Sequence, residues 1–234
     1  MKFIVLLIIV IIMYLILRFV FDYNMNKIKE IGEDKELDKL TQKYPENVEI
    51  CKWYLKRLKN ENVKIEEDKN SNSTLYLVMS NKIFIADLKE GYTRIQTIAH
   101  ECLHSIQSKK LLWFNFIFSN IYLVYFLVVC ILAILKVLPF KMTFMAIFIL
   151  LSLVYYAVRT YLENDAMIKA RFLAKEYMQE NAISSQEEID IIVDKYDELN
   201  DIGIRCTNFK FLSNIIIKVI ILATIFCYSS VRIM

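Results

Sequence analysis

Four long apolar stretches constrain this chain more than any other feature of its sequence. They are Phe3 to Phe21, Phe114 to Leu135, Leu138 to Val158, and Leu212 to about Ser229. An α-helix needs about 20 mainly apolar residues to cross a bilayer's hydrocarbon core, and each stretch is near that length. With 56% hydrophobic residues, three glycines and two prolines, the chain is also too apolar and too poor in turn residues for an ordinary soluble domain. The sequence predicts a mainly α protein with four transmembrane helices.

The first apolar stretch has two interpretations, a retained anchor or a cleaved signal peptide. Its apolar run is longer than the roughly 7 to 15 residues of a signal-peptide core, and no small-x-small cleavage site is present. We therefore expect a retained anchor. Arg18 and Lys218 lie inside or near the ends of spans, where long cationic side chains are expected to snorkel to the membrane surface.

The spans divide the chain into five segments. In order, we expect an anchor, a first polar segment, a transmembrane hairpin, a second polar segment, and a last helix with its tail, at residues 1–21, 22–112, 113–158, 159–211 and 212–234. Four crossings place both polar segments on one side of the membrane. Basic residues flank the spans mainly on that side, which predicts that the polar segments lie on the cytoplasmic side of the cell membrane.

The cysteine and charge content add two expectations. Five cysteines, of which Cys130 and Cys227 lie within spans, form no disulfide framework, and this is typical of a reducing compartment. A formal net charge of +3 without a basic block gives no reason to expect nucleic acid as a partner.

Periodicity predicts several helices in the two polar segments. The expected helices are Asn26 to Lys43, Val48 to Lys59, Thr93 to about Lys109, Arg159 to Glu180, and one that starts after Ser185 and ends near Asp201, before Gly203. Two starts carry the capping-box pattern, Thr93 with Gln96 and Ser185 with Glu188.

The first polar segment also predicts a short β-hairpin. After a polar loop at Asp68 to Ser73, the β-rich stretches Thr74 to Met79 and Lys82 to Asp87 flank Ser80 and Asn81. We expect an unpaired edge near Lys82 to Asp87. Such an edge either binds an extended peptide by strand addition or belongs to a hairpin with a purely structural role.

The residues His100, Glu101 and His104 form an H-E-x-x-H motif. Positions i and i+4 of a helix place both imidazoles on one face, where they can hold one zinc ion, and the glutamate can then act as general base on a water that zinc activates. The chain has only two histidines, and both occupy this motif. A chance arrangement of surface histidines is therefore the weaker interpretation.

A catalytic zinc needs a third protein ligand and an open position. Because no histidine remains, the third ligand is expected to be a carboxylate, with Glu163 as the first candidate and Asp165 as its competitor. If Glu163 is the ligand, Asp165 is expected to orient a histidine or the neighbouring backbone without binding the metal itself. Ala166, Ala170 and Ala174 recur every four residues, and this stripe of small side chains would let the helix approach the histidine helix closely.

These residues resemble the gluzincin membrane peptidases, in particular the neutral zinc metallopeptidases of bacterial membranes, and more distantly the HtpX-type and CAAX prenyl protease families. The resemblance covers Lys82 to Gln107, with the run from Ile98 to Gln107, and then Arg159 to Ala170. It implies a core of histidine helix, second ligand helix and β-hairpin. It also implies that His100, His104 and Glu163 bind zinc, with Glu101 as base. HtpX-type enzymes carry an aspartate four residues after the ligand glutamate, where this chain has Met167.

The sequence thus predicts a zinc metalloendopeptidase that acts on membrane-associated or misfolded proteins and peptides at the membrane surface. A donor for the oxyanion is expected among Tyr161, Tyr177 and Arg205, and the sequence does not choose among them. Two alternatives are a zinc-binding sensor or scaffold without proteolytic activity and a metal-free membrane interaction protein. The intact Glu101 disfavours the sensor, since a structural zinc site has no use for a base.

Overall fold

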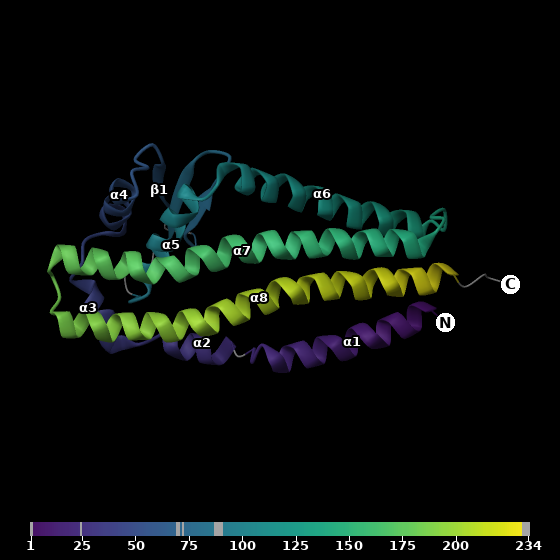
Figure 1. Cartoon of the computed structure of the whole chain (residues 1–234), viewed down its shortest axis with the longest axis horizontal. Helices are drawn as coiled ribbons and strands as arrows, with labels where there is room; N and C mark the ends of the chain where they lie inside the picture. Colours follow the sequence, from purple (N-terminus) through teal and green to yellow (C-terminus); the bar gives the residue numbers. More distant parts are fainter. Residues whose placement is uncertain (1, 24, 69–70, 72, 87–90, 231–234) are drawn as a thin grey trace. The chain divides into compact units, whose positions relative to one another are not determined.

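The computed structural model describes residues 2–23, 25–68, 71, 73–86 and 91–230. These residues are mainly helical and form eight helices and three strands. In chain order the elements are α1 (Lys2–Val20), α2 (Met25–Gly32), α3 (Lys35–Gln42), α4 (Asn47–Arg57), β1 (Lys64–Asp68), β2 (Leu75–Leu77), β3 (Lys82–Ala86), α5 (Arg94–Ile106), α6 (Lys109–Ile134), α7 (Lys141–Asn181) and α8 (Gln186–Ser230) (Figure 1).

Four of the described helices, α1, α6, α7 and α8, are long and apolar enough to cross a membrane. This confirms the expected spans at the level of length and composition. Many of their apolar side chains are exposed; Phe19, for example, is 87% exposed. Contiguous apolar surface on this scale is typical of a lipid-facing protein rather than a water-soluble one.

The chain forms two compact units. The first, called here the membrane unit, comprises residues 1–23, 113–161 and 205–234, and the second, called here the polar unit, comprises residues 24–112 and 162–204. The helices α7 and α8 each run unbroken through residues of both units (Figure 1).

The membrane unit has its own apolar core, which includes Phe126, Phe148, Leu222 and Phe226. That Lys218 snorkels to the membrane surface stays a prediction. Its ammonium lies over the ring of the buried Tyr122, 4.6 Å from the ring centroid. A cation–π contact of this kind partly compensates a charge that has left water.

The polar unit contains a three-stranded sheet in the order β1-β3-β2. β2 pairs antiparallel with β3, so the expected hairpin is confirmed, although its Asp87 lies outside the described residues. β1 pairs parallel with the other side of β3. The expectation of a free edge near Lys82 is therefore wrong, because β3 is the central strand and β2 lies at an edge of the sheet.

β1 did not appear among the predicted strands. Its sequence ends in three successive acidic residues, Glu66, Glu67 and Asp68, so it lacks the alternation of apolar and polar residues that marks a half-buried strand. Asp68 also falls in this strand and not in the loop expected from Asp68 to Ser73. The pairing of β1 depends on β3, whose Ile83 and Ile85 are buried.

The helix expected at Asn26 to Lys43 is two helices, α2 and α3. Asp34 is the cause of the break, because its backbone is extended and its side chain accepts hydrogen bonds from the N–H groups of Glu36 and Leu37. An aspartate in this geometry caps a new helix N-terminus. The preceding residues, ending at Gly32, belong to α2.

The two capping boxes differ in outcome. Ser185 and Glu188 exchange the expected hydrogen bonds, from Glu188 N–H to Ser185 Oγ and from Ser185 N–H to Glu188 Oε2. Thr93 makes no side-chain cap, and the Gln96 amide instead hydrogen-bonds the buried Asn200 of α8. A long-range polar contact has replaced the local one at Gln96.

The expected end of the last polar helix near Asp201 is also wrong, since α8 continues through Gly203 into the fourth apolar span. A Cβ atom at Gly203 would lie 2.9 Å from Cε of Met167. The glycine thus permits close packing of α8 against the Met167 side chain of α7. It does not end the helix.

Candidate metal centre

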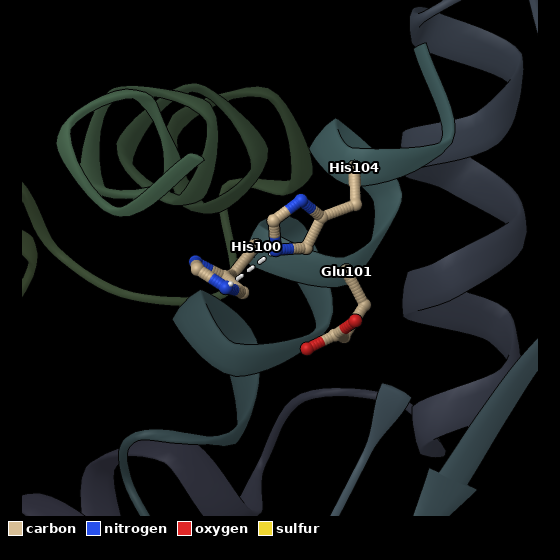
Figure 2. A group of neighbouring side chains, drawn as sticks. All are labelled: His100, Glu101 and His104. Atoms are coloured by element: carbon tan, nitrogen blue, oxygen red, sulfur yellow. Dashed lines mark hydrogen bonds between the residues drawn. The ribbon is translucent and has the colours of Figure 1, made fainter. Parts of the chain in front are cut away.

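The histidine helix is α5, which ends at Ile106. Its apolar face, including Ile95, Ile98 and Cys102, is fully buried in the core of the polar unit. Figure 2 shows that His100 and His104 project from the same side of this helix, with the carboxylate of Glu101 beside them. The Nε2 atoms of the two imidazoles lie 3.0 Å apart.

The carboxylate of Glu163 reaches both imidazoles. Its Oε2 lies 3.5 Å from Nε2 of His100 and 3.6 Å from Nε2 of His104. All three side chains are partly buried. The expected alanine stripe on α7 is fully buried in the same core as α5, at Ala166, Ala170 and Ala174. That these small side chains bring α7 close to the histidine helix stays a prediction.

The spacing of these three donor atoms can be compared with that needed around a metal ion. Atoms separated by 3.0, 3.5 and 3.6 Å lie on a circle with a radius of about 2.0 Å, close to the usual zinc–nitrogen and zinc–oxygen distances. His100, Glu101 and His104 also form a group whose ligand atoms lie within 4.8 Å of one another. Two imidazoles and a carboxylate at this spacing fit a zinc ion, and the donor set by itself also suits other divalent transition metals.

Glu101 has a different set of contacts from Glu163. Its Oε2 accepts a 2.7 Å hydrogen bond from the backbone N–H of Tyr76 in β2. The edge strand thus holds the carboxylate of Glu101 beside the two histidines, while Glu163 approaches them from α7. Glu163 thus has an oxygen near both Nε2 atoms, whereas Glu101 is hydrogen-bonded to β2.

Burial and charge shift the pKa values of two groups in this site. Removal from water raises the pKa of Glu101, although the neighbouring His100 and His104 and the Tyr76 N–H act in the opposite direction. Burial alone would lower the pKa of His104. The hydrogen bond and charge of Glu163, together with the charge of Glu101, outweigh that effect and raise it.

Asp165, the competing ligand, makes its described contacts elsewhere. Its carboxylate pairs with Lys169 and accepts a 3.1 Å hydrogen bond from the amide Nε2 of Gln107. The amide Oε1 of Gln107 lies 2.9 Å from Nδ1 of His104. Asp165 is therefore connected to a histidine through Gln107, a residue to which the sequence analysis assigned no role. A polar residue three positions after the second histidine, just past the helix end, was the available signal.

Of the three candidates for an oxyanion donor, Tyr177 belongs to the polar unit. It is 2% exposed, and its ring packs against those of Tyr44, Trp53 and Tyr54. This burial makes Tyr177 a poor donor to a bound substrate. Tyr161 and Arg205 belong to the membrane unit.

Comparison with known proteins gives no family for this chain. No protein-family model, no curated protein and no solved structure matches it.

Proposed function

We propose that this chain is an integral membrane zinc metallopeptidase. The observation that carries the proposal is the triangle formed by Nε2 of His100, Nε2 of His104 and Oε2 of Glu163, whose size suits one zinc ion. A second carboxylate, that of Glu101, lies near the same histidines, and we assign it the role of base because its Oε2 is held by the Tyr76 N–H, so that three ligands remain for the metal. Three protein ligands with one open position are typical of catalytic rather than structural zinc.

In this proposal each side chain has one task. His100, His104 and Glu163 hold the ion, which when bound would supply a Lewis acid for activating water and polarising a carbonyl. Glu101 accepts a proton from the attacking water as the water oxygen adds to the carbonyl carbon of the peptide bond. It then delivers that proton to the amide nitrogen as the C–N bond breaks.

The edge strand β2 is the proposed binding surface for the substrate backbone. Tyr76 directs its N–H toward Glu101 and not toward its partner Ile83 in β3, so this side of β2 faces the metal centre. An extended peptide that lies along this edge would have its backbone beside Glu101, and it would have to pair through backbone groups other than the Tyr76 N–H, which Glu101 already accepts. The exposed side chains of Leu77 and Met79 favour apolar substrate residues.

Membrane-associated substrates are proposed because the apolar span and the third ligand share one helix. Within α7, Glu163 follows Val158, the last residue of the apolar stretch, by five positions. Five residues of α-helix correspond to a rise of about 7.5 Å. Proteins or peptides at the membrane surface would therefore reach the centre most readily.

The proposal is tested by zinc analysis and cleavage assays on the full-length protein purified in detergent. We expect about one zinc ion per chain, as for a single catalytic site. Glu163→Ala should lose this zinc, whereas Asp165→Ala should retain a larger share. Cleavage of casein and of a membrane-tethered protein should fall about 10²-fold or more in Glu101→Gln, as general-base removal usually costs, while zinc stays bound.

The outcomes separate the proposed function from its alternatives. A folded wild-type protein that binds no zinc would refute the metal centre and leave a metal-free membrane protein. Bound zinc with no cleavage of either substrate would contradict the peptidase and favour a sensor. Glu187→Gln, which changes an exposed glutamate in the first turn of α8, is the matched control for Glu101→Gln and should leave zinc content and cleavage unchanged.

A further inference from the structure

Gln107 is the residue at which α5 ends, and its backbone is extended. Its side-chain amide makes three contacts with groups around the metal centre. Oε1 lies 2.9 Å from Nδ1 of His104, and Nε2 donates to the backbone oxygen of Leu162 at 2.8 Å and to Oδ2 of Asp165 at 3.1 Å. One amide therefore connects the helix that carries both histidines with the turn of α7 that carries Glu163.

The surroundings determine which way this amide faces. The carbonyl of Leu162 only accepts hydrogen bonds, and so does an ionised aspartate. Both lie on one side of Gln107, so the NH₂ group must face them and the oxygen must face His104. Asp165 is itself held by Lys169, one turn further along α7. If the amide were reversed, two acceptors would face its oxygen without a hydrogen between them.

An amide oxygen that faces Nδ1 of His104 requires a hydrogen on Nδ1. In the neutral imidazole this leaves the lone pair on Nε2, and Nε2 is the atom that lies near His100 and Glu163. The orientation of Gln107 thus selects the form of His104 that can bind a metal. The bond to Leu162 acts on the other ligand helix, because Leu162 immediately precedes Glu163.

We propose that Gln107 is the positioning residue of this centre, and that Asp165 acts through it by keeping the amide in the orientation that directs Nε2 of His104 toward the metal. The inference rests on the proposed function in assuming that the centre binds zinc. It extends that function by assigning separate tasks to two side chains that do not touch the metal. It also replaces the competing role of Asp165 as a ligand.

The first test reads the hydrogen position on His104 directly in the metal-free protein. Because the chain has only two histidines, uniform ¹⁵N labelling of histidine gives NMR signals from four ring nitrogens, and His100→Asn assigns those of His104. At a pH where both imidazoles are neutral, wild-type His104 should carry its hydrogen on Nδ1. In Gln107→Leu the hydrogen should move largely to Nε2, since Nδ1 has lost its acceptor.

The second test measures zinc affinity by competition with a chromophoric chelator. Removal of a group that orients a metal ligand typically weakens metal binding 10- to 100-fold, and we expect a loss of about this size for Gln107→Leu. Gln107→Glu should also bind zinc more weakly, because it places a second carboxylate against Asp165. Adding Asp165→Asn to Gln107→Glu supplies an amide donor toward the new carboxylate, whose other oxygen can still accept from Nδ1 of His104, and should recover most of the affinity.

The controls keep this inference separate from the proposed function. Gln179→Leu changes an exposed glutamine of the same helix as Asp165, and should alter neither the NMR signals nor the affinity. Unchanged hydrogen position and unchanged affinity in folded Gln107→Leu would overturn the role of Gln107 while the peptidase proposal stands. If wild type binds no zinc, the peptidase proposal fails. The NMR measurement then still decides whether Gln107 sets the tautomer of His104. A hydrogen on Nε2 of His104 in the wild type would overturn the role of Gln107.

Discussion

The thiols of Cys51 and Cys102 lie 3.6 Å apart, Sγ to Sγ, between α4 and α5. Both side chains are fully buried. Cys102 stands inside the H-E-x-x-H motif, directly after Glu101, but on the opposite, core-facing side of the helix. This contact shows how one turn of α5 serves two purposes, with the core packing on one face and the candidate metal centre on the other.

We expect neither thiol to react while the protein is folded. Burial and the contact with Cys51 raise the pKa of Cys102 well above its ordinary value, and the thiolate is the reactive form. Iodoacetamide followed by mass spectrometry should therefore modify both cysteines only after unfolding. Ser73→Cys, which introduces an exposed thiol, should react at once in the folded protein. Rapid modification of Cys102 in the native protein would contradict the packing of α4 against α5.

Arg94 is expected to be the most sensitive position for stability in the polar unit. Arg94 is 1% exposed, and its guanidinium donates to the backbone oxygens of Thr41, Tyr44 and Pro45 and to Oδ1 of Asn47. Arg94→Met would leave these buried acceptors without donors, at a cost on the order of 3 kcal/mol in the free energy of unfolding. Denaturant unfolding in detergent measures this.

The exposed Arg57 provides the comparison for Arg94. It forms ion pairs with Glu176 and Glu180 at the surface, and such pairs contribute about 1 kcal/mol or less. Arg57→Met should therefore change the free energy of unfolding much less than Arg94→Met. Equal effects of the two substitutions would mean that the hydrogen bonds of Arg94 add little.

Glu101 is expected to reduce stability in the metal-free protein. Burial raises its pKa in the folded state above the ordinary glutamate value, so the folded state binds the proton more tightly than the unfolded state. Stability then falls as the pH rises from the ordinary value through the raised one. In the presence of a chelator, Glu101→Gln should melt at a higher temperature than wild type at neutral pH, and the difference should vanish below about pH 4, where the glutamate is protonated in both states.

Glu101→Gln keeps a side-chain oxygen that can accept from the Tyr76 N–H, so the loss of the negative charge is the main change. Thermal melting across this pH range measures the effect. Glu187→Gln, at an exposed site, should show no such pH-dependent gain. A lower melting temperature for Glu101→Gln at neutral pH would mean that the charged hydrogen bond to Tyr76 contributes more than burial costs.

The orientation in the membrane gives a further prediction. The basic residues that flank the spans favour a cytoplasmic position for residues 22–112 and 159–211. After four crossings both chain ends then lie on the opposite side. A reporter that is active only outside the cytosol, fused after Met234, should be active, and one fused within the polar segments should not. The reverse pattern would place the candidate centre outside the cytosol.

The spans and the histidine motif could be predicted because their signals are local. A run of apolar residues has the length of a membrane helix whatever surrounds it, and His100 and His104 share a face of any helix that contains them. The capping box at Ser185 and the β-hairpin are local in the same way, and both are present. Whether the centre binds zinc, and whether it cleaves peptides, stays a prediction.

The remaining features depended on contacts between residues far apart in the sequence. β1 pairs because β3 offers a buried partner, although the sequence of β1 carries no strand pattern. α8 continues through Gly203, where Cε of Met167 lies in the space that a Cβ atom would need. The carboxylate of Asp165 is hydrogen-bonded to Gln107, whereas that of Glu163 lies beside the histidines. The sequence alone determined which chemical groups are available and the helices that carry them. Only the tertiary structure decided which carboxylate meets the histidines, because that choice depends on how α5 and α7 pack.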